Sequence, residues 1–274
     1  MKEMTANDGL ERFRTGAAKY AAYLETPDGR LRLDLAFANL QEFLPHATEP
    51  LLALDLGCGT GAMAVRLAQL GLHVTSLDAS EPMLEFAKRT AREAGVAERV
   101  APKHGDATQL AALFPDQSFD VILCHNILEY IDDPGAVLRS AARALRSPSS
   151  IISIVVRNQA GDVLKAAIQD GDLAAAEQNL ASEWGHESLY GGPVRLFTTN
   201  SLQAMLLESS LAVIAERGIR VLSDYLPPQV SRSDEYQRIL ELERKLSARP
   251  EFAAIARYTH CLAHRAPLVM KGSA

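Results

Sequence analysis

The sequence is poor in cysteine and has no long apolar run. Its 274 residues include only three cysteines, Cys58, Cys124 and Cys261, and none of them forms a CxxC pair. Such isolated cysteines argue against a disulfide framework and favour reduced thiols in the cytoplasm. No apolar stretch approaches the roughly 20 residues of a membrane span, and residues 1–4 do not begin a secretory signal. We therefore expect a cytoplasmic protein that does not enter the membrane.

Positive charge is also in short supply. The chain has 28 Lys and Arg against 34 Asp and Glu, which gives a formal net charge of −6. This balance disfavours a broad nucleic-acid surface, which needs clustered cations, although it permits a local basic patch. His260 and His264 are four residues apart on an expected strand and so lie too far apart to share one ion. We expect no metal site.

The central part of the chain alternates short apolar runs with amphipathic segments, which indicates βαβ units in a parallel, doubly wound α/β sheet. Helices are expected from residue 60 to 70, from 82 to 94 and from 134 to 145. The apolar runs predict strands at 51–56, 73–77, 99–104, 119–124 and 151–156.

The rest of the chain reads as additions to the same domain. Residues 1–45 predict a helical N-terminal cap, 50–157 a ligand-binding core, 158–200 an insertion on the acceptor side, and 201–265 the end of the sheet. The insertion contains two helices and a polar loop at 182–193. Two last strands, at 213–222 and 255–263, complete a seven-stranded sheet whose final strand is antiparallel. The whole chain, 1–274, is expected to form one domain.

The most informative motif follows the first strand and reads Asp-Leu-Gly-Cys-Gly-Thr-Gly from Asp55 to Gly61. Glycines let the backbone turn sharply and approach a ligand closely. A dinucleotide fingerprint would read G-x-G-x-x-G and place a pyrophosphate at the helix N-terminus. The spacing G-x-G-x-G after Asp55 instead suits a ligand with an amino-acid end, whose ammonium group an acid can hold directly or through water.

Acidic residues end the next two strands as well. Asp78 lies where a carboxylate can accept both ribose hydroxyl groups. Asp106, in the Gly105–Ala107 segment, can meet an adenine amino group. These positions fall at the carboxyl edge of the sheet, where open α/β sheets bind ligands.

Together these motifs resemble the class I S-adenosylmethionine methyltransferases, which have a Rossmann-like fold. The segment Phe119–Ile122 is similar to that family's fourth-strand signature, and His125–Ile131 to the segment that lines its methyl-transfer site. The resemblance covers about residues 50–157. It implies S-adenosylmethionine as cofactor.

A narrower resemblance extends further along the chain. Residues 29–32, 125–131, 157–158, 218–226, 236–243 and 256–260 resemble the bacterial tRNA methyltransferases that esterify the carboxylate of 5-carboxymethoxyuridine. By this resemblance Arg32 reaches the donor's carboxylate. The two resemblances together imply a donor site formed by Arg32, Asp55, Gly57, Cys58, Gly59, Asp78, Ala79, Met83, Gly105, Asp106, Ala107 and His125.

The methyl acceptor stays open between a small molecule or peptide and a tRNA. The stretch from Asp170 to Glu187 is acidic where the tRNA enzymes are expected to be lysine-rich, and acidic residues repel RNA. A carboxylate acceptor needs no general base but does need orienting groups, for which Arg157, Arg220 and Tyr225 are candidates. An amine or hydroxyl acceptor needs a base, for which the candidates are His125 and His186.

Two functions of other classes compete with this interpretation. A nicotinamide-dependent oxidoreductase would share the sheet topology, but the third glycine is misplaced and no Tyr-x-x-x-Lys motif occurs. A non-catalytic protein that binds S-adenosylmethionine would look much the same in sequence. A monomer and a homodimer are both compatible with the sequence.

Overall fold

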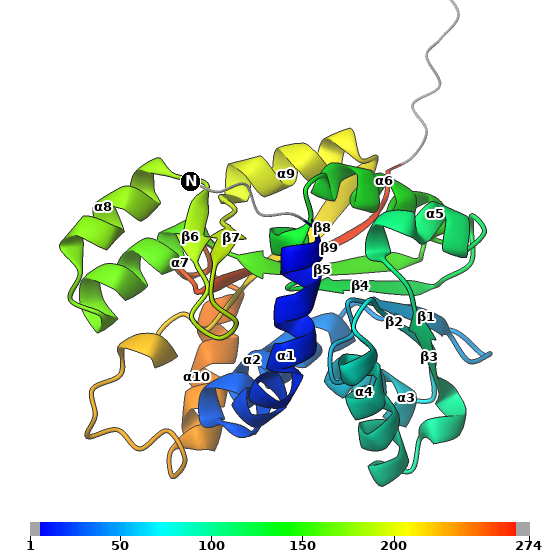
Figure 1. Cartoon of the computed structure of the whole chain (residues 1–274), viewed down its shortest axis with the longest axis horizontal. Helices are drawn as coiled ribbons and strands as arrows, with labels where there is room; N and C mark the ends of the chain where they lie inside the picture. The colour runs from blue at the N-terminus through cyan, green and yellow to red at the C-terminus, as the bar shows by residue number, and fades with distance from the viewer. Residues whose placement is uncertain (1–5, 267–274) are drawn as a thin grey trace, which may run out of the picture.

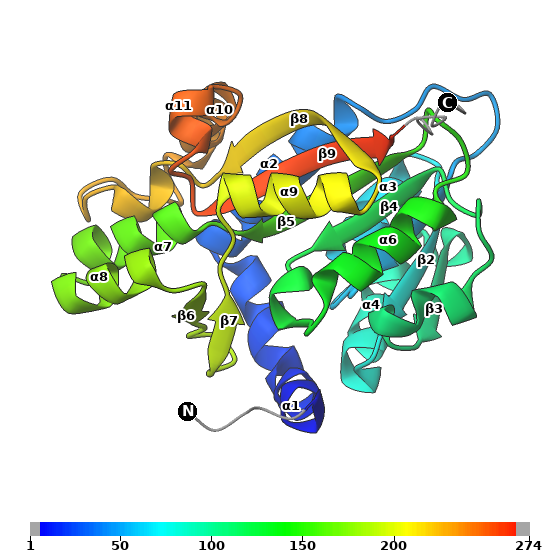
Figure 2. The same cartoon turned by 90° about the horizontal axis from the view of Figure 1, so that it is seen from above.

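The computed structural model describes residues 6–266, which form a mixed sheet of seven strands between two layers of helices (Figures 1 and 2). The order across the sheet is β3-β2-β1-β4-β5-β9-β8. The strands β1 (Leu52–Leu56), β2 (His73–Asp78), β3 (Val100–His104), β4 (Val121–His125) and β5 (Ile151–Arg157) are mutually parallel. The predicted α/β sheet is therefore confirmed.

The last two strands close the sheet at one edge. β9 (Tyr258–Arg265) runs antiparallel to both β5 and β8 (Leu211–Ile219). The antiparallel final strand is thus confirmed, but both strands are displaced from their predicted bounds. Arg220 lies just beyond β8 with a φ of 60°, so its place inside the predicted strand at 213–222 is wrong. The left-handed turn carries its side chain out of the sheet.

Each face of the sheet packs against its own set of helices. On one face α5 (Leu110–Leu113), α6 (Pro134–Ala144) and α9 (Thr199–Glu208) bury residues such as Leu138 and Leu202. The other face packs against α2 (Pro27–Gln41), α3 (Ala62–Gln69), α4 (Glu81–Glu93) and α10 (Tyr236–Ser247), with Leu35 and Leu40 fully buried. Apolar residues on both faces of the strands produce this three-layer packing.

The helical N-terminal cap consists of α1 (Ala6–Glu25) and α2, which meet at a sharp junction. Thr26 caps α2, because its hydroxyl accepts a hydrogen bond from the backbone N–H of Gly29, and Pro27 occupies the first helical position. Both features favour a helix start. In Figure 1, α1 stands in front of the carboxyl edge of β4 and β5.

The insertion after β5 contains more regular structure than its sequence predicts. α7 (Gln159–Leu164) continues into one π-helical turn, and α8 (Leu173–Ala181) follows. The segment 182–193, predicted as a polar loop, contributes to a hairpin of β6 (Trp184–His186) and β7 (Pro193–Arg195). The prediction of a plain loop is wrong, because the glycine-rich turn at residues 191–192 lets the chain fold back and pair with itself.

A short helix, α11 (Pro250–Ala253), leads into β9. The preceding helix is α10. Its many charged side chains around residues 241–245 predict a face exposed to solvent, and for Glu243 this prediction is wrong. Glu243 is fully buried and accepts hydrogen bonds from the backbone N–H groups of Val221, Leu222 and Ser223 at 2.7, 3.0 and 2.8 Å. It therefore fixes the turn that carries Arg220. Within residues 6–266, no helix combines the length and apolar character that a membrane crossing requires.

Candidate active site

A cavity of about 530 Å³ lies at the carboxyl edge of the parallel strands. A smaller recess of about 40 Å³ shares Arg32, Gly57 and His125 with it. Asp55 and Cys58 line the recess, and Tyr225 lines neither space. The other predicted site residues all line the main cavity: Arg32, Gly57, Gly59, Asp78, Ala79, Met83, Gly105, Asp106, Ala107, His125, Arg157 and Arg220.

The glycine loop after β1 forms one wall of this cavity. Gly57 has a φ of 65°, and a Cβ there would lie 2.6 Å from Cδ1 of Ile127, so a larger residue cannot occupy this turn. The N–H of Gly59 donates to Oδ2 of Asp78 at 2.9 Å, and the N–H of Ser80 donates to Oδ1 at 2.8 Å. Asp78 therefore joins the loops after β1 and β2, and its carboxylate has lone pairs left for a ligand.

Asp55 is a buried carboxyl group with an unsatisfied oxygen. Its side chain is 4% exposed, and Oδ2 has no hydrogen-bond partner among the described residues. Burial, and then the neighbouring charge of Asp78, raise the pKa of Asp55 to about 7. Such a group gains from a cationic ligand. The adjoining recess also has room for a water molecule between the two.

Arg32 is a buried cation with no carboxylate partner among the side chains described from residue 11 to 266. Its guanidinium is buried, yet its hydrogen bonds go to Oδ1 of Asn126 at 3.1 Å and to the hydroxyl of Tyr20 at 2.8 Å. The rings of Tyr23 and Tyr258 lie 5.2 and 5.7 Å from its Cζ atom. Aromatic faces compensate a buried cation only in part, so this guanidinium can take an anionic ligand.

The third loop of the predicted donor site follows β3. Asp106 caps the next helical turn, because its Oδ1 accepts hydrogen bonds from the N–H and the hydroxyl of Thr108, both at 2.8 Å. Its other oxygen has no hydrogen bond within the described structure. At Gly105 a Cβ would lie 2.9 Å from Leu113, so the backbone there runs close to the wall. Asp106 can accept from a ligand amine at the far end of the cavity from Arg32.

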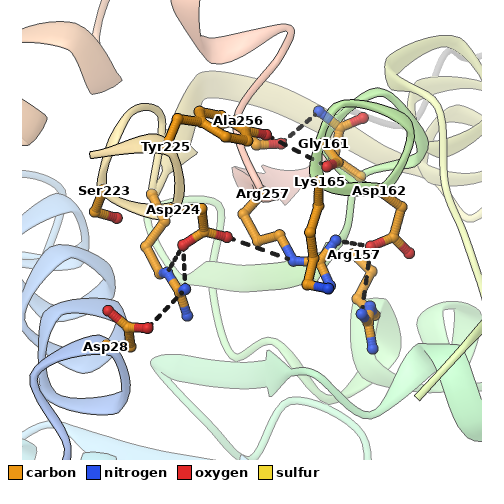
Figure 3. Close-up of polar contacts among 12 residues, drawn as sticks. Asp28, Arg157, Gly161, Asp162, Lys165, Ser223, Asp224, Tyr225, Ala256 and Arg257 are labelled. Atoms are coloured by element: carbon orange, nitrogen blue, oxygen red, sulfur yellow. Dashed lines mark hydrogen bonds and ion pairs between the residues drawn. The ribbon is translucent and has the colours of Figure 1, made fainter. Parts of the chain in front are cut away.

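The opposite wall carries a continuous series of alternating charges from six segments of the chain. Figure 3 shows its central part, in which Arg257 pairs with both Asp224 and Asp162, and Asp162 pairs with Arg157. Arg220 extends the series at one end, and Glu187 lies 2.6 Å from Arg157 at the other. In order, the members are Asp28, Arg220, Asp224, Arg257, Asp162, Arg157 and Glu187.

The pKa of Tyr258 shows the effect of the arginines near this wall. Burial alone would raise the pKa of its phenol, but the nearby Arg32, Arg220, Arg257 and Arg157 bring that pKa below its ordinary value. Because Tyr258 lines the cavity, a negatively charged oxygen is stabilised at this point. The arrangement suits an anionic ligand group better than a cationic one.

His125 lies between the two walls, at the end of β4. Burial and the charge of Arg32 lower its pKa to about 3, so its ring is neutral. Its Nε2 atom lies 2.8 Å from the hydroxyl of Ser153. A group with so low a pKa is a weak general base near neutral pH. His186, the other candidate base, is exposed on β6 and does not line the cavity.

The tip of the β6–β7 hairpin meets α1 across the mouth of the cavity. Nη1 of Arg12 donates to the carbonyl oxygen of Gly191 at 2.9 Å. The ring of Phe13 lies edge-on to those of Tyr130 and Tyr190, with centroids 4.9 and 5.0 Å apart. These contacts hold the N-terminal cap and the insertion together and restrict access to the site.

Sequence reasoning missed several residues of this site. Asn126, Glu187 and Tyr258 line the cavity, and Asp162 pairs with the arginines behind it, but none was singled out. Tyr225, which was singled out, donates from its hydroxyl to the carbonyl oxygen of Gly161 at 3.5 Å, outside the cavity lining. The sequence signal for Asn126 is its place directly after the fourth apolar run. In the structure its φ of 53° lies in the left-handed region.

Comparisons with known proteins agree with this geometry. Residues 54–153 match the family model described as a methyltransferase domain. The tRNA 5-carboxymethoxyuridine methyltransferase of Escherichia coli K12 is 26% identical over 248 residues, covering 88% of this chain and 90% of that protein. The ubiquinone biosynthesis O-methyltransferase of Pseudomonas aeruginosa is 37% identical over 106 residues, but these are only 38% of this chain and 44% of that protein.

Solved structures share the fold. The 1,6-didemethyltoxoflavin-N1-methyltransferase of Burkholderia thailandensis, with S-adenosylhomocysteine bound, has a TM-score of 0.61 at 17% identity, covering 97% of this chain and 93% of that one. The [4+2]-cyclase SpnF has a TM-score of 0.57 at 19% identity, covering 85% and 80%. Since a methyltransferase and a cyclase share this architecture, the fold by itself does not define the reaction.

The glycine loop, the acids that follow the strands and the family match together define the class. The chain is an S-adenosylmethionine-dependent methyltransferase, with its methyltransferase domain at residues 54–153. Among these enzymes it is distantly similar, over most of its length, to a tRNA carboxymethoxyuridine methyltransferase and, over its core, to ubiquinone O-methyltransferases. The residues present fit the donor. Its ammonium group matches the unsatisfied oxygen of Asp55, and its carboxylate matches Arg32, which has no carboxylate partner among the side chains described from residue 11 to 266.

Proposed function

We propose that the chain is a carboxyl O-methyltransferase that esterifies a small polar acid. The buried arginines of the opposite wall carry this proposal. Arg157, Arg220 and Arg257 line the cavity. Together with Arg32, they lower the pKa of the Tyr258 phenol, so a negatively charged oxygen is favoured there. Guanidinium groups bind carboxylates with directional, charge-assisted hydrogen bonds. Neither candidate histidine suits a base: the pKa of His125 is lowered to about 3, and His186 does not line the cavity. This agrees with a carboxylate acceptor, which is already ionised at neutral pH.

The donor in this proposal lies along the first three loops. Arg32 would hold its carboxylate, Asp55 its ammonium group, Asp78 its ribose hydroxyls and Asp106 its adenine amino group. These four groups follow one another along the sheet edge, and Gly57 and Gly59 between them leave room for the ligand. Bound there, S-adenosylmethionine supplies a methyl group made electrophilic by its sulfonium.

Transfer then needs alignment and no proton movement. A carboxylate oxygen forms a bond to the methyl carbon while the carbon–sulfur bond breaks and its electron pair stays on sulfur. Arg157 and Arg220 would orient the acid, and the contact of α1 with the hairpin would exclude water. Positioning of this kind can lower a barrier by roughly 7–11 kcal/mol.

A second candidate acceptor is the wobble carboxymethoxyuridine of tRNA. It is favoured by the relative that is 26% identical across 88% of this chain, since this similarity extends well beyond the methyltransferase core. The two candidates share the same carboxylate chemistry and differ in what carries the acid. The net charge of −6 favours the small acid. A cytoplasmic location suits both acceptors, and the three cysteines, all buried and unpaired, agree with it.

The test is a transfer assay with donor that carries a tritiated methyl group. The acceptors are a panel of small carboxylic acids and tRNA that contains unesterified carboxymethoxyuridine. Mild alkali releases a methyl ester as volatile methanol but leaves N-methyl and ether products intact. We expect alkali-labile label in a small acid. Label in tRNA alone would select the second candidate, and alkali-stable label would refute carboxyl transfer.

A matched pair of variants tests the donor half of the proposal. Asp78→Ala should abolish binding of S-adenosylhomocysteine in calorimetry, because it removes the ribose contact and releases Gly59 and Ser80. Asp116→Ala is the control, since Asp116 is an exposed acid that lies 3.8 Å from Arg143 and away from the cavity. Equal affinity in the two variants would contradict the assignment of Asp78.

A further inference from the structure

A buried row of polar side chains connects the cavity to the far side of α2. His125, Ser153 and His260 lie on the adjacent strands β4, β5 and β9, and the hydroxyl of Ser153 is 2.8 Å from Nε2 of each histidine. Nδ1 of His260 is 3.4 Å from Nδ2 of Asn39 on α2. The row ends at Ser247 on α10, whose hydroxyl donates to Oδ1 of Asn39 at 3.4 Å.

Four of these five side chains are almost completely buried. Ser153, Ser247 and His260 are 0% exposed, and Asn39 is 4% exposed. Buried polar groups are strongly driven to satisfy their hydrogen bonds. Burial lowers the pKa of His260 well below its ordinary range, as it does that of His125, so both rings are neutral. Each ring therefore has one N–H and one bare nitrogen.

The amide of Asn39 sets the direction of the whole row. In the structure the amide of Asn39 turns its oxygen toward the hydroxyl of Ser247 and its nitrogen toward His260. In this orientation the amide nitrogen donates, so Nδ1 of His260 must be the bare, accepting nitrogen. The proton of His260 is then on Nε2, which donates to the oxygen of Ser153. The hydroxyl of Ser153 is left to donate to Nε2 of His125.

The reverse direction fails at its last step. If His125 donated to Ser153 and Ser153 donated to His260, then Nδ1 of His260 would carry the proton. That N–H would face the N–H of Asn39, which leaves two donors opposed and both unsatisfied in a buried site. Such a mismatch costs roughly 1–3 kcal/mol. With the amide of Asn39 in the orientation of the structure, only one direction satisfies every member.

We propose that Asn39, His260 and Ser153 are positioning residues that fix His125 in the Nδ1–H tautomer, so that it acts as a hydrogen-bond donor to the bound acceptor. No described protein group hydrogen-bonds to Nδ1 of His125, and the residue lines the cavity. Its N–H is therefore available to a ligand oxygen. The tautomer follows from the protein alone, whereas its use in transfer rests on the carboxyl acceptor proposed above.

Nitrogen NMR of the full chain, labelled with ¹⁵N-histidine and free of ligand, tests the tautomer directly. Protonated and bare imidazole nitrogens have well-separated shifts, and a His125→Gln variant assigns the signal among the seven histidines. We expect a protonated Nδ1 and a bare Nε2 in the native protein. A bare Nδ1 overturns the proposal, whatever the acceptor proves to be.

Asn39→Asp should reverse the whole row with a change of one group. A carboxylate at residue 39 accepts from Nδ1 of His260, so Ser153 turns toward His260, and His125 must donate from Nε2. His125 would then present a bare Nδ1 to the cavity. We expect its two nitrogens to exchange their states, and an unchanged pattern in a folded variant contradicts the direction of the row.

Two serine variants separate this effect from a loss of packing. Ser153→Ala cuts the row and should leave His125 as a mixture of both tautomers, whereas Ser209→Ala removes another buried hydroxyl, near Gly135, and should leave it unchanged. With the acid found by the transfer assay, Ser153→Ala should raise the KM for the acid roughly tenfold and leave the affinity for S-adenosylhomocysteine unchanged. A single tautomer retained in Ser153→Ala would overturn the proposal.

Discussion

Nη1 of Arg32 donates a hydrogen bond to Oδ1 of Asn126 at 3.1 Å across 94 positions of sequence. This contact joins the N-terminal cap to the loop after β4 and holds a buried cation in the lining of the cavity. A neutral amide positions the guanidinium but leaves its charge uncompensated. The charge is therefore available to a ligand carboxylate.

Replacing Arg32 should weaken binding of the donor's amino-acid end but not of its nucleoside end. In Arg32→Gln the affinity for S-adenosylhomocysteine should fall about tenfold to a hundredfold, the loss expected for a hydrogen bond to a charged group. The affinity for 5′-methylthioadenosine, which has no amino-acid end, should stay within about twofold. Calorimetry with both ligands provides the comparison, and equal losses for the two would place the carboxylate elsewhere.

Asp55 should link donor binding to pH. Its folded pKa of about 7 lies above the value near 3.9 of an unfolded carboxyl group, so from about pH 4 to 7 the folded protein holds the extra proton. The free energy of unfolding should therefore fall as pH rises through this window and level off above it. Asp55→Asn should flatten this part of the profile in denaturant titrations.

The same group should release a proton when the donor binds. A ligand ammonium favours the ionised carboxylate, so at pH 6 S-adenosylhomocysteine should displace the proton of Asp55. Calorimetry in two buffers of different ionisation enthalpy counts that proton. The count should drop by about one in Asp55→Asn, and an equal count in both proteins would contradict the ammonium contact.

Arg220 should affect acceptor binding and stability separately. Arg220→Met leaves Asp224 buried with one charge partner fewer, and breaking such a pair typically costs about 3–5 kcal/mol. Adding Asp224→Asn should recover much of this stability without restoring the KM for the acid. Denaturant titrations and steady-state kinetics measure the two effects, and a normal KM in the double variant would remove Arg220 from the acceptor site.

Glu243 should affect acceptor binding indirectly, because it holds the turn that follows Arg220. Glu243→Gln replaces an acceptor oxygen with an NH₂ group opposite three backbone N–H groups, which should cost about 1–3 kcal/mol of stability. Because these N–H groups belong to the turn after Arg220, the KM for the acid should also rise while donor affinity does not. The exposed neighbour Glu241→Gln is the control. If both variants unfold at the same denaturant concentration, the hydrogen bonds of Glu243 contribute nothing to stability.

The loops that bring the proposed donor residues to one cavity could be predicted from the sequence because their signals are local. The glycine loop, Asp78 and Asp106 each directly follow a run such as Leu52–Leu56, whose burial and β-propensity make the strand evident. The carboxyl edge of a parallel sheet then brings these strand ends together without further information.

The charged wall proposed to bind the acceptor depends on contacts between distant segments. Asp162, Asp224 and Arg257 meet only because α7, the turn after β8 and the start of β9 converge, and no periodicity encodes that convergence. The burial of Glu243 is hidden for the same reason, since its helix is charged on most sides. Ser153 did leave a signal, as the one polar residue in the apolar run Ile151–Val156.

The most direct measurement of the central claim is a crystal structure of the chain with S-adenosylhomocysteine. The account predicts its carboxylate beside Arg32, its ribose hydroxyls on Asp78 and its adenine amino group beside Asp106. Its sulfur should face the wall that carries Arg157 and Tyr258. Density for the nucleoside outside this cavity, or bound with its carboxylate away from Arg32, would contradict it.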